Sequence, residues 1–195
     1  KGVPGFLEGS NKGWATAEYD LLPASVGSRR SRERGGKLSG RTQEIQRLIG
    51  RSLRAVLDLE KLTGWTLKID CDVLQADGGT RTASVNGAYI ASVIALQKAL
   101  ADGRLSEQPL VEAIGAISVG IVGDDILLDL DYSEDSRANV DFNVVQTEGG
   151  RFLEVQGTAE GEPFSREQLD RLLDLAATAI QEIISRQKEL IAQLD

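Results

Sequence analysis

QADGGTRTAS, residues 75–84, joins a strand-like run to a run with the composition of a helix, residues 83–100. A helix N-terminus leaves its first backbone N–H groups unpaired and carries the positive end of the helix dipole. Two glycines let an anion approach those groups, and Thr80 and Arg81 add a hydroxyl and a guanidinium. The stretch therefore predicts a phosphate-binding site. From these residues alone, a glycine-rich turn that only caps a buried helix is an equal alternative.

The composition excludes several kinds of active site. The 195 residues contain no histidine and a single cysteine, Cys71. The chain therefore cannot build a Ser-His-Asp or Cys-His site, a histidine-ligated metal site, a zinc cluster or an internal disulfide. Catalysis must use carboxylates, arginine, lysine, hydroxyl groups or a metal ion held by oxygen atoms. Cys71 lies in a strand-like run, so we expect a core residue in a reducing, intracellular compartment.

The length and hydropathy of the chain predict a globular protein. With 41% hydrophobic residues, the chain can bury a core of its own. No apolar run approaches the roughly 20 residues of a membrane-spanning helix, so we expect neither a membrane span nor a signal peptide. The sequence contains no methionine, and we expect it to lack the start of its gene product.

Basic residues are concentrated in one segment, although the whole chain has a net charge of −8. Residues 29–54 contain nine basic and two acidic residues, and eight of the nine are arginines. Such a segment repels itself unless it faces a polyanion or an acidic surface, and arginine favours bidentate contacts with phosphate. We therefore predict a nucleic-acid contact here. A solvated flexible loop is the alternative, since charged loops with glycine are common.

Hydrophobic periodicity predicts alternating strands and helices. Strands are expected at residues 13–22, 66–75, 113–122, 126–131, 138–146 and 151–157, and helices at residues 42–59, 83–100 and 166–194. Ser39 is expected to cap the first helix, and Ser165 with Gln168 the last. Arg47, Arg51 and Arg54 would share one helix face. The pattern predicts an α+β fold with mixed or antiparallel sheets and packed helices.

Carboxylates are concentrated in residues 124–141. Seven of them occur against one basic residue, Arg137, and such a group repels itself unless water or a cation neutralises it. Asp141 lies on the polar face of its predicted strand, and it could share a divalent ion with Asp135 only if the chain bends near Ser136. The spacing alone favours a solvated acidic loop over a shared metal site, and it does not fit an EF-hand.

Four blocks of the sequence together resemble the bacterial ribonuclease PH family. They are LSGRTQEIQRLIGRSLRA at residues 38–55, DCDVLQADGGTRTAS at 70–84, LDLDYSEDSRANVDFNVV at 128–145 and EVQGTAEGEPFS at 154–165. The blocks follow the order of the family and cover nearly the whole chain from Gly13 to the final helix. The resemblance implies a ribonuclease PH-like fold, the fold of domain 2 of ribosomal protein S5. It also implies that residues 1–195 form a single domain that lacks the family's N-terminal strands.

The resemblance further implies a reaction and its residues. A member of the family is expected to be a phosphate-dependent 3′-to-5′ exoribonuclease that trims the 3′ ends of tRNA precursors and releases nucleoside diphosphates, with inorganic phosphate as co-substrate. By motif position, the expected phosphate-binding residues are Arg41, Gly79, Thr80 and Arg81. The expected catalytic residues, which would also hold a divalent metal ion, Mg²⁺ or Mn²⁺, are Asp135 and Asp141.

The partners that the resemblance implies are RNA and further copies of the chain. A cytoplasmic homohexamer, a trimer of dimers, is expected, and the arginines expected to face tRNA are Arg29, Arg30, Arg32 and Arg34. Trp14 and Tyr19 could stack on bases, although strand aromatics are more often core residues. The alternative function is a catalytically silent RNA-binding ring subunit of the exosome type. Such subunits typically lose the carboxylates or the GGTR arginine, and this chain keeps both. A purely structural role for the acidic and basic groups is a third hypothesis.

Overall fold

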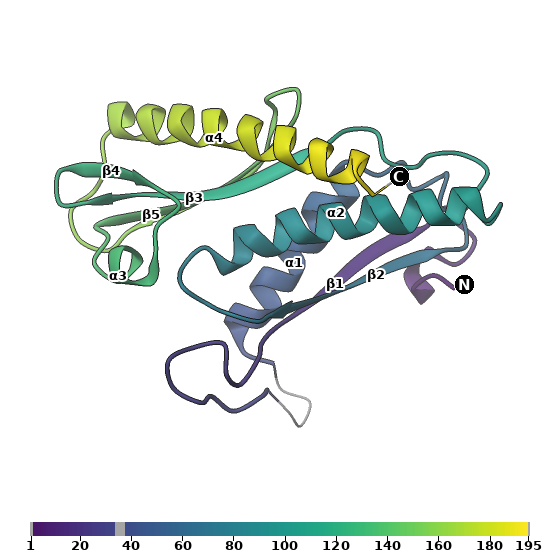
Figure 1. Cartoon of the computed structure of the whole chain (residues 1–195), viewed down its shortest axis with the longest axis horizontal. Coiled ribbons are helices and arrows are strands. Elements are labelled where there is room, and N and C mark those ends of the chain that lie inside the picture. Colours follow the sequence, from purple (N-terminus) through teal and green to yellow (C-terminus); the bar gives the residue numbers. More distant parts are fainter. Residues whose placement is uncertain (1, 34–37, 195) are drawn as a thin grey trace.

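The helices and strands form two consecutive groups along the chain (Figure 1). The structure is a computed structural model that describes residues 2–33 and 38–194. After a 3₁₀ turn at Gly5–Leu7, the first group comprises β1 (Trp14–Leu21), α1 (Gly40–Ala55), β2 (Thr66–Val73) and α2 (Thr80–Ala101). The second group comprises β3 (Ile114–Val122), β4 (Asp125–Leu128), α3 (Tyr132–Asp135), β5 (Val140–Thr147), β6 (Phe152–Ala159) and α4 (Arg166–Ala192).

Strands β1 and β2 form a parallel pair, with Trp14 opposite Thr66 and Leu21 opposite Val73. Parallel neighbours need a crossover connection, and α1 lies in that connection and packs on β1. The predicted alternation of β1 is confirmed, because Ala15, Ala17 and Tyr19 are buried while the residues between them are exposed. The apolar stripe of α1 is buried as well; it includes Ile45, Leu48, Ile49 and Leu53.

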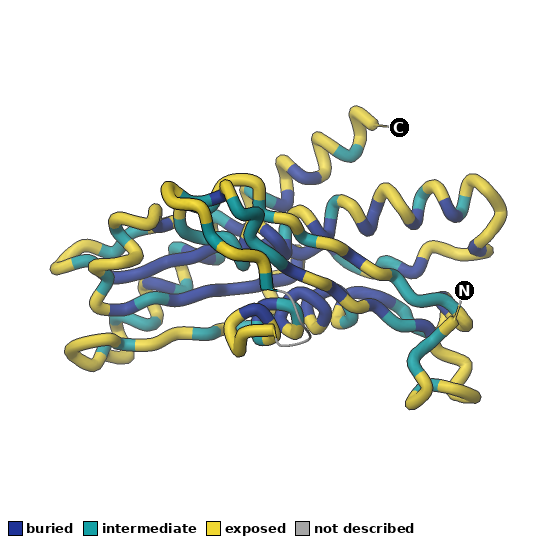
Figure 2. Tube along the Cα trace, turned by 90° about the horizontal axis from the view of Figure 1, so that it is seen from below, coloured by how far each residue is buried: buried dark blue, intermediate teal, exposed yellow. Residues whose placement is uncertain are grey.

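Strands β3 to β6 form an antiparallel sheet in the order β4-β3-β5-β6. Strand β3 is buried from Ile114 to Ile121, because α4 and α2 both pack against it. Figure 2 shows β3 and β5 as buried strands inside the molecule. A strand covered on both faces has a nearly continuous apolar sequence, as AISVGIV has at residues 116–122.

Asn86 of α2 completes the edge of β3 where β4 does not reach. Pairing between β3 and β4 begins only at Val119. The Asn86 side chain donates to the carbonyl oxygen of Ala116 and accepts from its N–H, both at 2.9 Å. These bonds satisfy backbone groups that would otherwise be buried without partners, and they join the two groups of elements.

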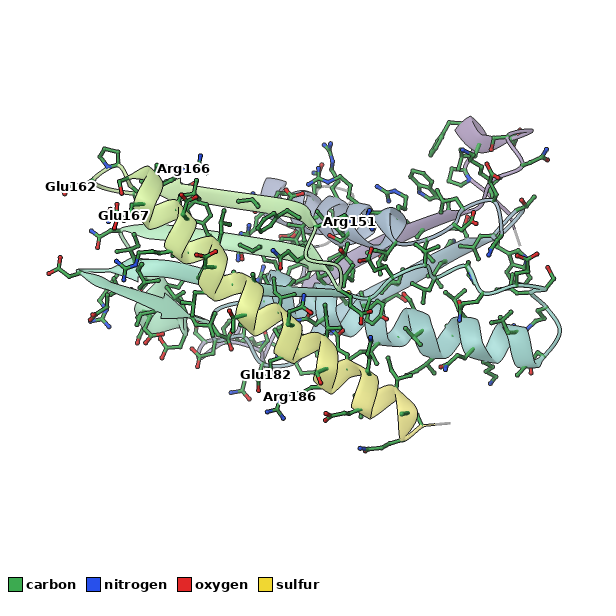
Figure 3. The ribbon with its side chains drawn as sticks, turned by 90° about the horizontal axis from the view of Figure 1, so that it is seen from above. Arg151, Glu162, Arg166, Glu167, Glu182 and Arg186 are labelled. Carbon is green, nitrogen blue, oxygen red and sulfur yellow. The ribbon has the colours of Figure 1, made fainter. Side chains whose placement is uncertain are left out.

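Helix α4 begins with the predicted capping box, in which the side chains of Ser165 and Gln168 each accept a hydrogen bond from the other residue's backbone N–H. Its inner face is buried and carries Leu172, Ala176, Ile180 and Ile184. The exposed side of the helix carries ion pairs four residues apart, Arg166 with Asp170 and Glu182 with Arg186 (Figure 3). The helix is therefore amphipathic and lies on the sheet with its apolar face.

The sequence predicted these elements, but several ends differ. Helix α2 starts at Thr80 instead of residue 83, because Gly79 already occupies the N-cap position. Helix α1 ends at Ala55 instead of residue 59, since the chain leaves the helix so that Leu57 forms an isolated bridge with Leu110. The predicted α+β fold with mixed or antiparallel sheets and packed helices is confirmed, with one parallel pair of strands and one antiparallel sheet. Within residues 2–33 and 38–194, no helix has both the length and the apolar character that a bilayer span requires.

Candidate active site

The loop at Gly78 and Gly79 opens helix α2 in a conformation that suits glycine. Both residues have positive φ, 77° and 53°. A Cβ atom on Gly78 would overlap the carbonyl oxygen of Leu130 and lie 2.9 Å from the carbonyl carbon of Asp131. The first backbone hydrogen bond of the helix runs from Ala83 N–H to the Gly79 oxygen. The N–H groups before Ala83 therefore lie at the open end of the helix, where an anion can accept from them.

Arg81 lies in the first turn of α2, between α1 and β6. Its Nη1 donates to Gln156 Oε1 at 2.7 Å and to Glu44 Oε1 at 3.4 Å. The neighbouring Thr80 hydroxyl shares a 2.8 Å hydrogen bond with the hydroxyl of Tyr19. Only 14% of the Arg81 side chain is exposed. The guanidinium is thus held at the open end of α2, where it adds full positive charge to that of the helix dipole.

Arg41 lies in the first turn of α1 and is exposed. The predicted cap is confirmed, because the Ser39 hydroxyl accepts a hydrogen bond from Thr42 N–H at 3.1 Å. The Glu33 carboxylate accepts from Ser39 N–H at 2.8 Å and from the Thr42 hydroxyl at 3.1 Å. The hydrogen bonds from Ser39, followed by those from Thr42 and the charge of Arg30, lower the pKa of Glu33. These hydrogen bonds stabilise the start of α1, where Arg41 is exposed.

The acidic segment folds into a helical turn and then reverses into a strand. Asp131 and Glu134 form a reciprocal capping box around α3. The chain turns after Ser136 and returns as β5, so the bend that a shared site requires is present. Tyr132 N–H donates to Asp77 Oδ1 at 3.2 Å, which ties α3 to the glycine loop. Asp135, at the end of α3, is exposed.

Asp141 is the carboxylate on which the charges of the phosphate-binding and acidic candidates act. It is half-buried in β5, opposite Gly120 of β3 and Thr158 of β6. Burial and the charge of Asp135 raise its pKa, and the charges of Arg81 and Arg41 lower it. The charge of Glu160 also raises this pKa. The structure therefore brings Arg81, Arg41 and Asp135 close enough to act on one carboxylate, although they lie on three different helices.

Two residues of this site lie in the quoted sequence blocks but were assigned no role from the sequence. Gln156 and Glu44 contact Arg81 from β6 and α1, at 75 and 37 residues' separation along the chain. Gln156 is opposite Asn143 in the sheet, two positions from the pair of Asp141 with Thr158. Alternation in β6 could have shown that Gln156 and Thr158 share a face, but not that this face meets α2.

The predicted RNA-contacting arginines lie in an irregular segment before α1. Arg29 and Arg32 are exposed, and Arg30 forms a 3.9 Å ion pair with Glu33. Arg34 lies outside the described residues. The segment is tied to the glycine loop, because Ala76 N–H donates to the Ser25 carbonyl oxygen at 2.7 Å. The exposed arginines are thus free to meet an anionic partner beside the site.

Other basic and aromatic residues make contacts within the protein. Arg51 pairs with Glu154 at 3.1 Å, whereas the Arg54 guanidinium lies 4.2 Å from the Trp14 ring centroid and donates to the Ala15 carbonyl oxygen at 2.8 Å. Tyr19 is only 4% exposed. Arg51 and Arg54 of α1 therefore make contacts within the protein, and Tyr19 is a core residue, as we expected strand aromatics to be more often than base-stacking residues.

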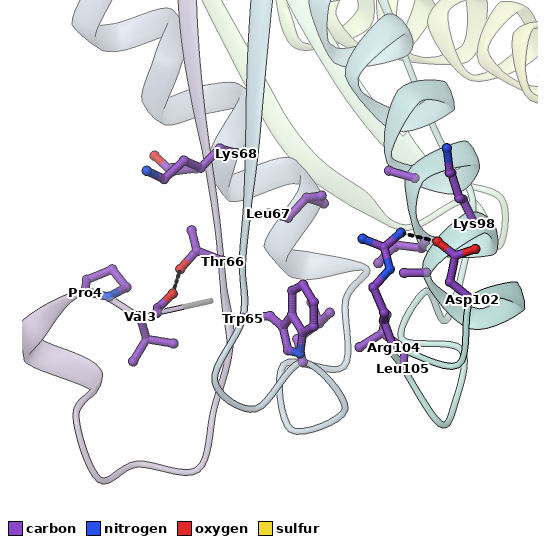
Figure 4. A pocket seen from close by; sticks show the side chains of 16 residues that line it. Val3, Pro4, Trp65, Thr66, Leu67, Lys68, Lys98, Asp102, Arg104 and Leu105 are labelled. Carbon is purple, nitrogen blue, oxygen red and sulfur yellow. Dashed lines mark hydrogen bonds and ion pairs between the residues drawn. The ribbon is translucent and has the colours of Figure 1, made fainter.

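Cys71 lies close to the start of α2, where its thiol donates to the Ser84 carbonyl oxygen at 3.9 Å, whereas a cavity lies farther from the site. Burial, followed by the charges of Asp70 and Asp72, raises the pKa of the Cys71 thiol to about 11, which suits a structural residue. A cavity of about 1130 Å³ lies at the opposite end of α2 from Arg81, beside Trp65, and the Arg104–Asp102 ion pair lies at its wall (Figure 4). Its lining contains neither the glycine loop nor the acidic pair.

The chain matches family descriptions and curated proteins over most of its length. Residues 2–99 match the 3′ exoribonuclease family, domain 1, and residues 112–179 match the 3′ exoribonuclease family, domain 2. Ribonuclease PH of Neisseria meningitidis serogroup C is 56% identical over 191 residues, which are 97% of this chain and 79% of that protein. Ribonuclease PH of Bacillus pumilus is 56% identical over 98% of this chain and 80% of its own length. Ribonuclease PH of Synechococcus sp. is 57% identical over 98% of this chain and 77% of its own length.

Two solved structures have the same fold. Rice (Oryza sativa) Rrp46 superposes with a TM-score of 0.70 over 92% of this chain and 73% of its own, at 15% sequence identity. An archaeal exosome core chain superposes with a TM-score of 0.68 over 91% of this chain and 70% of its own, at 20% identity. At these identities the likeness establishes the fold alone.

Proposed function

The chain belongs to the ribonuclease PH family and is a phosphorolytic 3′ exoribonuclease that processes tRNA, and we propose that its reaction takes place where the glycine loop, Arg81 and Asp141 meet. The observation that carries this proposal is the set of charges acting on Asp141. The charges of Arg81 and Asp135 both act on the pKa of Asp141, and Arg81 donates to Gln156, which lies on the same face of the sheet as Asp141. Both observations support a common site for the phosphate-binding and acidic candidates.

Inorganic phosphate is the co-substrate of this family, and we propose that it binds at the open end of α2. The residues that would hold it are Arg41, Gly79, Thr80 and Arg81. The unpaired N–H groups of the first turn and the positive φ of Gly79 support this assignment, since they allow an anion to approach the backbone. Arg81 adds a guanidinium whose planar donors match phosphate oxygens.

Asp135 and Asp141 are proposed as the catalytic residues and as ligands of a divalent ion, Mg²⁺ or Mn²⁺. Among residues 2–33 and 38–194, no group of three or more histidine, cysteine or carboxylate side chains could hold a metal. A pair of carboxylates suits Mg²⁺, which proteins often bind through one or two carboxylates together with substrate phosphates. A bound cation would relieve the repulsion with which Asp135 raises the pKa of Asp141. The cation would also neutralise negative charge on the phosphate oxygens.

The reaction requires a nucleophile and a proton donor. An oxygen of inorganic phosphate attacks the phosphorus of the last phosphodiester, the bond from phosphorus to the O3′ of the penultimate nucleotide breaks, and a nucleoside 5′-diphosphate leaves. Arg81 orients the attacking phosphate. We propose that Asp141 also gives a proton to the departing O3′, through the carboxylate oxygen that does not hold the ion. The proton that hydrogen phosphate loses in the attack restores Asp141.

The RNA contact and the assembly are also proposals. Arg29, Arg30, Arg32 and Arg34 would contact the phosphates of tRNA, and the exposure of Arg29 and Arg32 supports this role. A homohexamer, a trimer of dimers, would gather these segments from several copies. We propose a single domain, because one cluster of buried residues includes both sheets. A cytoplasmic location, where bacterial tRNA is processed, completes the proposal.

The test uses a tRNA with a 3′ extension, incubated with and without inorganic phosphate. We expect nucleoside diphosphates from the unmodified protein only when phosphate is present. Arg81→Ala and Asp135→Asn should each lower this release by at least about 100-fold, the smaller end of what a positioned charged or acid-base group contributes. Normal release by both variants would refute the assignment of the site.

The matched controls change the same residue types elsewhere. Arg186→Ala removes an exposed arginine of α4 that pairs only with Glu182 in the described structure. Asp170→Asn removes an exposed carboxylate that pairs with Arg166. Both should retain full activity, so that loss in the site variants can be ascribed to position and not to net charge.

A further inference from the structure

Gln156 anchors one end of the Arg81 guanidinium. Its Oε1 accepts the 2.7 Å hydrogen bond from Arg81 Nη1, and Glu44 accepts the longer 3.4 Å bond from the same nitrogen. Across the described part of the chain, the side-chain hydrogen bonds of Arg81 all start at Nη1. The Nε and Nη2 groups therefore keep their N–H donors for a ligand.

This division of donors suits phosphate. A guanidinium is planar, and its Nε and Nη2 groups lie along one edge, where two parallel N–H groups can meet two phosphate oxygens. Anchoring Nη1 fixes the plane of the group and the direction of that edge. Without the anchor, the long side chain would lose this orientation and bind the same anion in many geometries.

The closest partner of Arg81 is neutral, and this matters for anion binding. An amide oxygen orients a guanidinium without cancelling its charge, whereas a carboxylate at the same distance would compete with phosphate. The one carboxylate that accepts a hydrogen bond from Arg81 in the described part of the chain, Glu44, lies at the longer distance, and 36% of its side chain is exposed, so water screens its attraction.

The anchor is built on the same strands as the acidic residue. Gln156 of β6 is opposite Asn143 of β5, and Thr158 of β6 is opposite Asp141 of β5. Because successive side chains alternate, Gln156 and Thr158 lie on one face with Asn143 and Asp141. The sheet therefore sets the position of Arg81 relative to Asp141 through Gln156.

We propose that Gln156 is a positioning residue that aims Arg81 at the attacking phosphate. The inference rests on the proposed function, in which Arg81 binds phosphate. Gln156 itself contacts neither phosphate nor RNA in this account, so its removal should change the use of phosphate and leave the use of RNA alone.

The test is the KM for inorganic phosphate and the KM for RNA of Gln156→Met, which keeps most of the side-chain volume and loses the acceptor. We expect the phosphate KM to rise about 10- to 100-fold, as for the loss of a hydrogen bond to a charged group, with the RNA KM within about twofold. Gln156→Glu keeps the acceptor and adds a charge that competes with phosphate, and it should raise the phosphate KM as well. Gln181→Met is the matched control, since Gln181, an exposed residue of α4, also makes one side-chain hydrogen bond, in which it donates to the Glu148 carbonyl oxygen.

Arg81→Ala is measured beside these variants and separates the two proposals. If Arg81→Ala remains active, the proposed site is wrong. If Arg81→Ala is inactive but both Gln156 variants keep the wild-type phosphate KM, only the positioning role is wrong. A purely structural role would lower the melting temperature of Gln156→Met and raise both KM values together, which would also overturn the inference.

Discussion

Replacing Gly78 by alanine should destabilise the protein by about 2–5 kcal/mol. The left-handed conformation, with φ 77°, costs a residue with a Cβ about 1–2 kcal/mol. The new methyl group would also overlap the Leu130 carbonyl oxygen and lie 2.9 Å and 3.0 Å from two backbone atoms of Asp131. Backbone cannot move aside as a flexible side chain can, and such overpacking costs about 1–3 kcal/mol. For a chain of this size, the sum corresponds to a melting temperature lower by about 4–20 °C.

The same substitution should impair phosphate use, because Gly78 holds the open end of α2 against the segment that leads to α3. Thermal unfolding followed by circular dichroism measures the first effect, and the KM for phosphate measures the second. Gly87→Ala is the matched control: Gly87 lies in the same helix, and a Cβ there would meet no atom within 4 Å. It should leave the phosphate KM unchanged and raise stability by about 0.5–1 kcal/mol. A Gly78→Ala protein that melts within about 1 °C of wild type would refute the argument from close approach.

Three further predictions concern charge and titration. Because the pKa of Asp141 is raised in the folded state, the stability it contributes is present below the ordinary pKa of an aspartate and is lost as pH rises through the raised value. Asp141→Asn should therefore be more stable than wild type in urea unfolding at pH 7 and no more stable near pH 3; equal stabilities at pH 7 would contradict this. Arg29→Ala with Arg32→Ala should weaken tRNA binding and reduce the slope of log K against log salt by about 1.5, and an unchanged slope would show that these arginines do not contact phosphates. The thiol of Cys71, with its pKa at about 11, should react with iodoacetamide at pH 8 about 100-fold more slowly than free cysteine, whereas a comparable rate would show an exposed thiolate.

The local parts of the site could be predicted from the sequence because their chemistry depends on neighbouring residues. The glycines and Arg81 begin a helix, as the QADGGTRTAS stretch indicated, and Ser39 and Ser165 cap helices as predicted. The bend near Ser136 that a shared acidic site requires is present too, although the spacing alone favoured a solvated acidic loop. Each of these features follows from the turn and capping preferences of a few consecutive residues.

The contacts between distant segments could not be predicted, since they depend on the register of the strands and on which face of each helix or strand another element covers. The polar face of β5 was expected to carry Asp141, but not to be largely buried; Asn143 on that face is only 5% exposed. Likewise, the charge count in residues 29–54 treats all arginines alike, whereas Arg54 turns inward over Trp14. Sequence pattern and composition indicate which residue types lie along one helix or strand. Whether a polar side chain there binds a ligand or packs inside the protein depends on which distant element lies against it.

The association of the phosphate-binding end of α2 with Asp141 is tested most directly by Asp141→Asn, with phosphate affinity and nucleoside diphosphate release measured on the same protein. Removing a negative charge beside Arg81 should leave phosphate binding, measured without a divalent ion, equal or tighter, while diphosphate release from 3′-extended tRNA in the presence of Mg²⁺ falls by at least about 100-fold. Diphosphate release at the wild-type rate, or phosphate binding lost together with activity, would contradict a reaction centre in which Arg81 binds phosphate and Asp141 serves the departing 3′ oxygen.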